Sequence, residues 1–321
     1  MSTIPTTFKR LRIPYTVIGG SRGVTNRRFP VSLSLLLLNR GGRLYKHSFI
    51  SELEQIGFDE IISIEGPAVS YDVESLARQF PSIRFIVLHE AASRGEQINL
   101  GMGEANGEFV FVMWNDMRIA SASISSRLVD RIREQKALCA VPLLQNSKVE
   151  TVPSIMAPAF YRKLLKVLPL PPSADGTVSL FPFDFTGVYS KELFILSGGY
   201  DHNLTNPYWQ KMDFGFRVYM WGEKIVCNTS LRLGYLGEVP SEDSTPDESY
   251  KMFFLKNLSI RYNADSGSLP YSRFVSYWLK SGSFFAALRE FRNVRKWVEI
   301  NKFRFKQDAR SITELWEVPE V

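Results

Sequence analysis

The chain has 321 residues, of which 45% are apolar, 13% aromatic and 22% charged. This composition is typical of a folded globular protein and excludes a disordered or collagen-like chain. No apolar run approaches the roughly 18 residues that a membrane-spanning helix needs, and the first ten residues lack the apolar segment of a secretory signal. The two cysteines are too few for a disulfide framework. The sequence therefore predicts a cytoplasmic protein with reduced thiols.

The net charge of +6 is unevenly distributed along the chain. Residues 1–51 contain nine lysines and arginines and no acidic residue, and residues 271–310 contain ten basic and three acidic side chains. The rest of the chain has an excess of acids. Basic ends of this kind could contact the phosphates of a nucleotide, a lipid surface or a nucleic acid, and charge alone does not distinguish these partners.

Residues 31–113 alternate short apolar runs with amphipathic stretches, which is typical of strand-helix-strand units on a mostly parallel sheet. Phe49, Ile50, Leu53 and Ile56, for example, recur at the spacing of one helix face. The pattern predicts strands over 31–38, 60–65, 83–88 and 108–113, joined by helices over 45–57, 71–80 and 94–105.

The remainder of the chain has a less regular pattern. The polar run 238–248 contains two prolines and several acids, which is typical of a linker, and the residues after it predict helices. The chain thus divides into a basic N-terminal segment (1–30), an α/β domain (31–237), the linker (238–248) and a helical C-terminal extension (249–321). Within 121–236 the pattern predicts helices over 121–135, 159–168 and 208–221, and strands over 137–141, 181–189 and 224–236.

A glycine-rich segment near the N-terminus does not support dinucleotide binding. Residues 18–24 resemble the phosphate-binding turn of short-chain dehydrogenases, but that turn must open a helix. Residues 26–30, Asn-Arg-Arg-Phe-Pro, cannot begin one. The dinucleotide interpretation is therefore rejected.

Polar residues follow each of the four predicted strands. In an open α/β sheet, ligands bind beyond the carboxyl ends of the strands, so we expect these side chains to meet in one crevice. They offer a carboxylate for ribose hydroxyls, arginines for phosphate oxygens, and an aspartate for a divalent metal or a sugar hydroxyl. The predicted nucleotide-diphosphate site consists of Asn39, Arg40, Glu65, Arg94, Asn115 and Asp116.

In this order, the segments resemble the nucleotide-sugar glycosyltransferases of the GT-A fold, a large and mostly inverting family. Residues 32–40, 59–66 and 94–116 resemble the Rossmann-like nucleotide-binding half, and 187–222 resemble the acceptor-side segment with the catalytic base. The resemblance implies a mostly parallel sheet flanked by helices. It also implies transfer of a sugar from a nucleotide-diphosphate donor to a saccharide or lipid-linked acceptor, in cell-surface polysaccharide or glycolipid synthesis.

The chain departs from the family at three motifs. Trp114-Asn115-Asp116 replaces Asp-x-Asp, so a Mn²⁺ or Mg²⁺ ion would depend on Asp116 and the donor phosphates and would bind weakly. Gln210-Lys211-Met212-Asp213 replaces Glu-Asp-x-Asp; because a lysine is normally protonated, Asp213 is the predicted base. Tyr235 aligns with a metal-binding histidine. These losses leave open a non-catalytic nucleotide-binding or sugar-binding module.

Structural interpretations remain open for several of these residues. The resemblance assigns Trp209 and Arg217 to the acceptor side, yet Trp209 could belong to the core, and Arg217 could pair with Asp213 one helical turn away. Arg94 could pair with a nearby glutamate, and Glu65 could be solvated surface.

The C-terminal extension allows two interpretations. Aromatic and basic residues interleave over 271–310, as in an interfacial helix whose cations snorkel at the inner face of a membrane. The alternative is a helix pair packed on the catalytic domain. We expect no nucleic-acid partner, because no aromatic platform or reading helix is present. A nucleotidyltransferase would need a lysine in its first loop, and residues 38–44 contain none.

Overall fold

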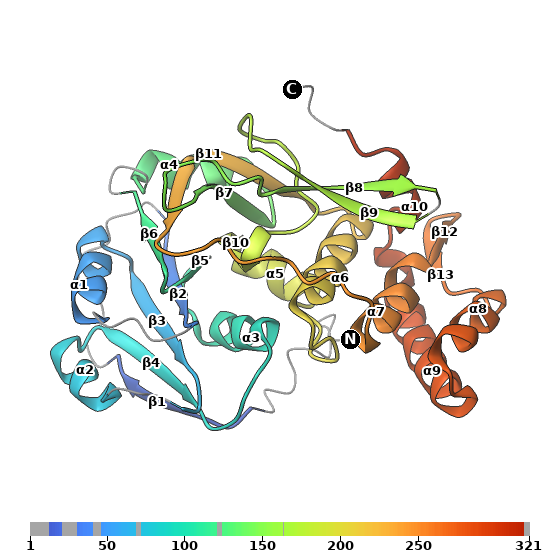
Figure 1. Cartoon of the computed structure of the whole chain (residues 1–321), viewed down its shortest axis with the longest axis horizontal. Helices are drawn as coiled ribbons and strands as arrows, with labels where there is room; N and C mark the ends of the chain where they lie inside the picture. Colours follow the sequence, from blue (N-terminus) through green and yellow to red (C-terminus); the bar gives the residue numbers. More distant parts are fainter. Residues whose placement is uncertain are drawn as a thin grey trace.

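A computed structural model of the chain describes residues 13–20, 31–40, 46–68, 72–120, 124–162 and 164–317. Its centre is a mixed sheet whose nine described strands lie in the order β1-β4-β3-β2-β5-β10-β7-β11-β6 (Figure 1). These strands are β1 (Tyr15–Gly19), β2 (Leu33–Leu38), β3 (Glu60–Glu65), β4 (Ile83–Leu88), β5 (Phe109–Trp114), β6 (Met117–Ile119), β7 (Cys139–Gln145), β10 (Gly187–Ser190) and β11 (Ile225–Tyr235).

The half of the sheet formed by β4, β3, β2 and β5 is parallel. All six residues of β2 and of β5 are buried, as expected for strands covered on both faces. The crossovers are α1 (Lys46–Ile56), α2 (Val73–Gln79) and α3 (Arg94–Glu104). Right-handed crossovers place α1 and α2 on one face and α3 on the other, because α3 returns across the sheet (Figure 1). The predicted fold class is confirmed.

Helix α3 approaches the sheet very closely. A Cβ atom on Gly101 would lie only 2.3 Å from Cδ1 of Leu36 on β2, so glycine is required there. The helix begins with a capping box: the Ser93 hydroxyl accepts a hydrogen bond from the backbone N–H of Glu96, and the Glu96 carboxylate accepts one from the backbone N–H of Ser93. This contact fixes the start of α3, which borders the carboxyl ends of β3 and β4.

The second half of the sheet is mostly antiparallel. β10 lies antiparallel between β5 and β7, β11 runs parallel to β7, and β6 pairs with the end of β11. Helix α6 (Pro207–Met220) is buried on every side over 209–220, which is typical of a helix inside the core of a large protein. The sequence predicted this helix within one residue at each end. The other helices of this half are α4 (Ser126–Glu134) and α5 (Lys191–Ser197).

The structure corrects several predictions. The strand predicted over 181–189 is shorter, because residues 183–185 form a 3₁₀ turn and β10 covers only Gly187–Ser190. The predicted helix over 159–168 is wrong: β8 (Ile155–Tyr161) and β9 (Leu164–Leu170) form an antiparallel hairpin. Along β9 the exposure alternates from residue to residue, and Pro158 and Pro169 disfavour a helix. The basic N-terminal segment contains an edge strand, β1, antiparallel to β4. The rest of the rejected glycine-rich turn, from residue 21 on, lies outside the described residues.

The C-terminal extension is helical, as expected, but it also contains a short hairpin. Trp221 at the end of α6 contacts it through the rings of Trp297 and Phe305, with ring centroids 5.9 and 6.2 Å apart. None of the described helices is long and apolar enough to span a membrane. The elements are α7 (Glu248–Phe253), a π-helical turn (Phe254–Leu258), β12 (Arg261–Asn263), β13 (Ser266–Ser268), α8 (Ser272–Ser281), α9 (Phe284–Asn301) and α10 (Ala309–Glu314).

Candidate active site

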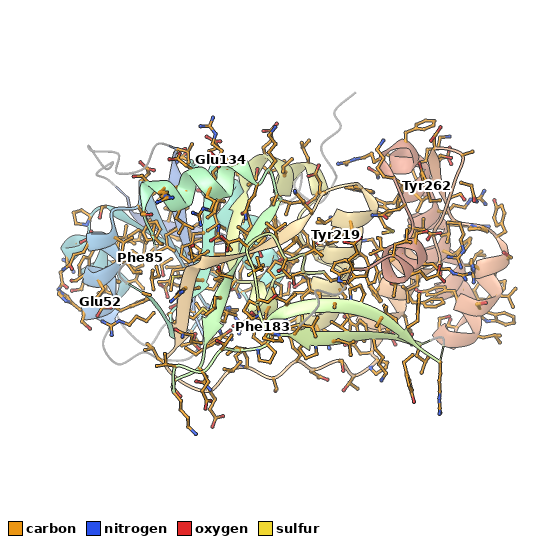
Figure 2. All side chains as sticks on the ribbon, turned by 90° about the horizontal axis from the view of Figure 1, so that it is seen from above. Glu52, Phe85, Glu134, Phe183, Tyr219 and Tyr262 are labelled. Atoms are coloured by element: carbon orange, nitrogen blue, oxygen red, sulfur yellow. The ribbon has the colours of Figure 1, made fainter. Side chains whose placement is uncertain are left out.

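A cleft of about 400 Å³ opens at the carboxyl ends of β3 and β4, where the α3 helix begins. The sequence predicted a crevice at this edge. Figure 2 shows Phe183, which precedes a residue of the site, near the middle of the molecule, between Phe85 of the parallel half and Tyr262 of the extension. The cleft is lined by Gly66, Pro67, Leu88, Ala91, Ala92, Ser93, Arg94, Gln97, Thr205 and Pro207.

Two predicted ligand-binding residues hold the strand ends together. The side-chain amide of Asn39, after β2, donates to the carbonyl of Ile64 on β3 at 2.7 Å. Glu65 ends β3, is 1% exposed and accepts a hydrogen bond from Ser63 at 2.7 Å. Glu65 is therefore not solvated surface. Neither residue lines the cleft: Glu65 is buried, and Asn39 is partly exposed.

Arg40 joins two carboxylates that come from distant parts of the chain. Its Nε donates to Asp116 at 2.8 Å, and its Nη1 and Nη2 both donate to Asp184, Nη1 at 3.0 Å. Its Cζ lies 4.1 Å from the centroid of the Trp114 ring. Burial acts to lower the pKa of Arg40, but the carboxylates of Asp184 and Asp116 raise it above the usual value. The guanidinium is thus held firmly charged.

Asn115, between these residues in the motif, is 4% exposed and positions the loop after β2. Its side-chain oxygen accepts a hydrogen bond from the backbone N–H of Arg40 at 3.1 Å. The structure therefore brings four of the predicted residues, Arg40, Asn115, Asp116 and Arg94, around Trp114.

Asp184 is the site residue that the sequence reasoning missed. It is buried, its backbone lies in the left-handed region with φ of 51°, and Phe185 follows with φ of 61°. The Trp114 indole donates to the carbonyl of Asp184 at 2.8 Å, and the Tyr235 hydroxyl donates to its carboxylate at 2.9 Å. Burial raises the pKa of Asp184, and Arg40 opposes this rise. The sequence signal that could have identified Asp184 is its place as an acid within the otherwise apolar run 181–185.

Arg94 is the second cation of the site. The expected pairing with a nearby glutamate does not form: Glu96 is engaged in the capping box with Ser93. The Arg94 guanidinium is half-buried, lies 5.2 Å from the Trp114 ring centroid, and has no hydrogen bond or ion pair within the described residues. Burial, followed by the like charge of Arg40, lowers the pKa of Arg94. Such a cation is suited to binding an anion.

The site does not fit a resident divalent ion. One oxygen of Asp116 and both oxygens of Asp184 are already bonded to Arg40 or Tyr235. The remaining oxygen, Oδ1 of Asp116, is buried and has no partner in the described part of the chain. An ion bound there would lie beside the Arg40 guanidinium, and like charges repel. No cluster of three or more His, Cys, Asp or Glu that could hold a metal occurs among the described residues.

The structure does not place Asp213 as a base. Asp213 is 0% exposed, and its carboxylate is bonded to Arg217 at 3.1 Å, Lys256 at 3.1 Å and Asn257 at 2.9 Å. A carboxylate enclosed by two cations and an amide cannot reach an acceptor hydroxyl in this arrangement. The pairing with Arg217 at i, i+4 was the alternative available from the sequence. Lys256 and Asn257, on the π-helical turn, could not be found by spacing.

The two other residues of the degenerate base motif have structural contacts. Gln210 accepts from the backbone N–H of Gly95 at 2.9 Å, and so ties α6 to the start of α3. Lys211 is 2% exposed, forms an ion pair with Glu242 of the polar run 238–248, and lies over the ring of Phe185. Glu242 is a partly exposed carboxylate whose partner is the buried Lys211.

The predicted acceptor-side residues are also in the core. Trp209 is 7% exposed, and its indole donates to the carbonyl of Thr245 at 2.9 Å. Arg217 is 3% exposed and donates to the carbonyls of Ser197 and Gly199 as well as to Asp213. Neither side chain faces the cleft, because both serve to fix the loops around α6.

Comparisons with known proteins agree with the fold. The chain is similar to the crystal structure of GalNAc-T7 with UDP, GalNAc and Mn²⁺, with a TM-score of 0.52 and 16% identity over 82% of this chain and 57% of that chain. It is less similar to S. aureus TarS 1–349 in complex with UDP-GlcNAc (TM-score 0.49, 13% identity, 70% of this chain and 64% of that one). A third likeness is to a Pyrobaculum calidifontis mannosyltransferase in complex with GDP-Man and Mn²⁺ (TM-score 0.43, 10% identity, 91% and 75%).

The similarity to GalNAc-T7 shows the class of fold. The chain has the GT-A fold of nucleotide-sugar glycosyltransferases, and it spans 57% of the length of the GalNAc-T7 chain. No family model matches the sequence, and no curated protein matches it.

Proposed function

We propose that the chain is a nucleotide-sugar glycosyltransferase that binds the diphosphate of its donor at Arg94. The observation that carries this proposal is the half-buried guanidinium of Arg94, which has no hydrogen bond or ion pair among the described residues. It lies 5.2 Å from the Trp114 ring centroid, beyond the carboxyl ends of parallel strands. A cation partly withdrawn from water with no counter-ion favours an anionic ligand. The neighbouring cleft, at about 400 Å³, is within the usual range for small-molecule sites and would hold the nucleoside.

In this proposal Arg94, Arg40 and Asp116 contact the donor. The strand ends are positioned by Asn39, Glu65 and Asn115. The acceptor oxygen attacks the anomeric carbon, and the bond between that carbon and the diphosphate oxygen breaks. The guanidinium groups of Arg94 and Arg40 balance the charge of the leaving diphosphate. We assign the proton of the acceptor hydroxyl to the Glu242 carboxylate, because Asp213 is enclosed.

A second candidate function is a binding module that retains the donor cleft without transfer. The observation that favours it is the base position, where Lys211 stands instead of a carboxylate. A protonated amine cannot accept the proton of the acceptor. This candidate predicts nucleotide binding without turnover.

Binding and turnover measurements separate the two candidates. We expect calorimetric binding of a nucleoside diphosphate, from a panel of UDP, GDP and CDP, and release of that nucleotide from the matching sugar donor. Glu242→Gln should lower turnover about 10²–10⁴-fold, the usual contribution of a general base, with little change in donor Kd. The control is Glu238→Gln, an exposed acid of the same polar run. Binding without any turnover in the wild-type protein would favour the module, and no binding at all would contradict both candidates.

We further propose a lipid-linked or membrane-proximal saccharide acceptor, in line with synthesis of a cell-surface polysaccharide or glycolipid. The support is the tip of the α8 and α9 helices, where large apolar side chains are exposed, Leu279 by 74% and Phe285 by 82%. Ten basic residues lie within 271–310, with three acids. Exposed apolar side chains surrounded by cations suit an anionic lipid surface. The apolar tip consists of Val275, Trp278, Leu279, Phe284 and Phe285.

Sedimentation with vesicles tests this contact. We expect binding to vesicles that contain phosphatidylglycerol and little binding to pure phosphatidylcholine, and loss of binding in the Leu279→Ser, Phe285→Ser double variant. The matched control is Phe160→Ser with Leu164→Ser, which removes exposed apolar groups from the β8–β9 hairpin. Equal loss in both variants, or no vesicle binding, would contradict the proposal.

A further inference from the structure

Arg40 is a guanidinium held in a fixed place by two carboxylates of the proposed donor site. Two carboxylates 68 residues apart, Asp116 and Asp184, are both bonded to this one guanidinium. Of the five N–H groups of Arg40, three hydrogen bonds go to these carboxylates, which leaves donors for a ligand. Its side chain is 21% exposed, so the group is accessible at the site without being solvated freely.

The position of Arg40 is held from several sides. Trp114 lies under its guanidinium, with 4.1 Å from Cζ to the ring centroid, and the Tyr235 ring lies 5.9 Å away. Tyr235 reaches the site because it pairs with Met117, directly after Asp116, across β11 and β6. Tyr235 then bonds Asp184, which in turn bonds Arg40. A bidentate carboxylate contact of this kind is rigid, and a lysine would not reproduce its geometry.

We propose that Arg40 takes the place of a divalent metal in this site, so that Arg40 and Arg94 together bind the donor diphosphate without a metal ion. The inference rests on the proposed donor binding and extends it. Both guanidiniums lie beside the Trp114 ring, with Cζ 4.1 and 5.2 Å from the ring centroid, and the proposal places one diphosphate against both. Arg40 already occupies three of the four oxygens of Asp116 and Asp184, the carboxylates that a metal ion at this place would need.

The first test compares nucleotide binding with and without metal. UDP, GDP and CDP are titrated into the wild-type protein in EDTA and in Mn²⁺, and free Mn²⁺ is measured by electron paramagnetic resonance without nucleotide. We expect the best nucleotide to bind with a Kd that changes less than threefold between EDTA and Mn²⁺, and no Mn²⁺ uptake by the protein alone. Binding that requires Mn²⁺, or tight Mn²⁺ uptake by the wild-type protein, would overturn the inference.

The second test removes the fixed charge. Arg40→Met should weaken metal-free nucleotide binding at least tenfold, and Mn²⁺ should restore it, because Asp116 and Asp184 then have free oxygens for the ion. Arg94→Met should also weaken binding, but without rescue by Mn²⁺. Arg118→Met, which removes a 68% exposed arginine, should change neither. If Arg40→Met does not fold, the double variant Arg40→Met, Asp184→Asn removes the uncompensated buried charge, and its metal-free binding is compared with that of Asp184→Asn alone.

The outcomes separate this inference from the donor-binding proposal. Undiminished metal-free binding by the Arg40 variants would overturn the inference and leave the proposed function standing. Absence of nucleotide binding in every condition would overturn the proposed function, and the inference with it. Weakened binding in Arg40→Met that Mn²⁺ does not restore would show a structural contact only, and would also overturn the inference.

Discussion

Trp114 is the residue around which the donor site is arranged. It ends β5, is 2% exposed, and presents its ring to two arginines while its indole N–H holds the carbonyl of Asp184. Guanidinium groups stack favourably on an indole, so one side chain positions both cations. Trp114 therefore supplies a platform for cations at the carboxyl end of β5.

At this scale we predict that Asp213 contributes to stability. Asp213→Asn should lower the free energy of unfolding by about 3 kcal/mol, because Arg217 and Lys256 lose a buried counter-ion. Donor Kd should not change, since Asp213 does not line the cleft. Urea unfolding and calorimetric titration check the two statements. The control is Asp130→Asn on the exposed face of α4, for which a change within about 0.5 kcal/mol is expected. Full stability with turnover reduced 10²-fold or more would return Asp213 to the role of base.

Part of the site could be predicted from the sequence, because the direction of the strands determines where the residues that follow them lie. Arg40, Asn115 and Asp116 meet because β2 and β5 are adjacent parallel strands, and their carboxyl ends share an edge. Asp184 and Glu242 come from loops outside the parallel half, and their contacts with Arg40 and Lys211 depend on tertiary packing. Periodicity carries no information about such pairs.

At the scale of elements, the packing of α3 against β2 is sensitive to the addition of a single methyl group. Gly101→Ala should destabilise the protein by about 1–3 kcal/mol, because the new Cβ would overlap Leu36. Gly103→Ala in the same helix meets no atom within 4 Å and should stabilise it by about 0.5–1 kcal/mol. Thermal and urea unfolding of the two variants check this pair. A change in stability of the same sign in both variants would contradict the close contact between α3 and β2.

The elements of the parallel half were predicted well because their strands are continuous apolar runs with helices at regular intervals. The β8–β9 hairpin was predicted as a helix because its short apolar run fits either period. What decides the hairpin is its tertiary placement, with β8 buried through Ile155, Met156 and Ala157. The edge strand β1 was missed because it is short and mostly exposed, with only half-buried side chains against the sheet.

For the whole molecule, an ion pair fastens the C-terminal extension to the α/β domain. Lys256 of the π-helical turn bonds Asp201 at 2.5 Å and also contacts Asp213. Burial alone would raise the pKa of Asp201, but Lys256 more than offsets this and holds the pKa below its usual value. The ionised carboxylate is therefore bound more strongly in the folded state than in the unfolded state. This stability is present above the unfolded pKa, near 4, and is lost as the pH falls below it.

Lys256→Met should therefore lower the free energy of unfolding by about 3 kcal/mol at pH 7 and make it less dependent on pH between 5 and 2. Urea unfolding across this pH range is the measurement. Lys251→Met is the control, because its partner Glu248 is 87% exposed and the pair should contribute less than about 1 kcal/mol. If the free energy of unfolding of the Lys256 variant fell between pH 5 and 2 as steeply as that of the wild-type protein, this result would contradict the role of the Lys256–Asp201 ion pair.

The left-handed backbone at Asp184 and Phe185 has a consequence for which substitutions selection would favour in this sequence. Each non-glycine residue in that region costs about 1–2 kcal/mol. At Phe185 the burial of the ring outweighs this cost, whereas at Asp184 selection for stability alone would favour glycine. A buried arginine-carboxylate contact, equally, can often be replaced by apolar side chains without loss of stability. A chain under pressure only to remain folded would therefore lose Arg40, Asp184 and the strained turn together. The chain carries all three, and we infer that this charge arrangement is kept for binding. We expect that a library of variants selected only for stability would lose it.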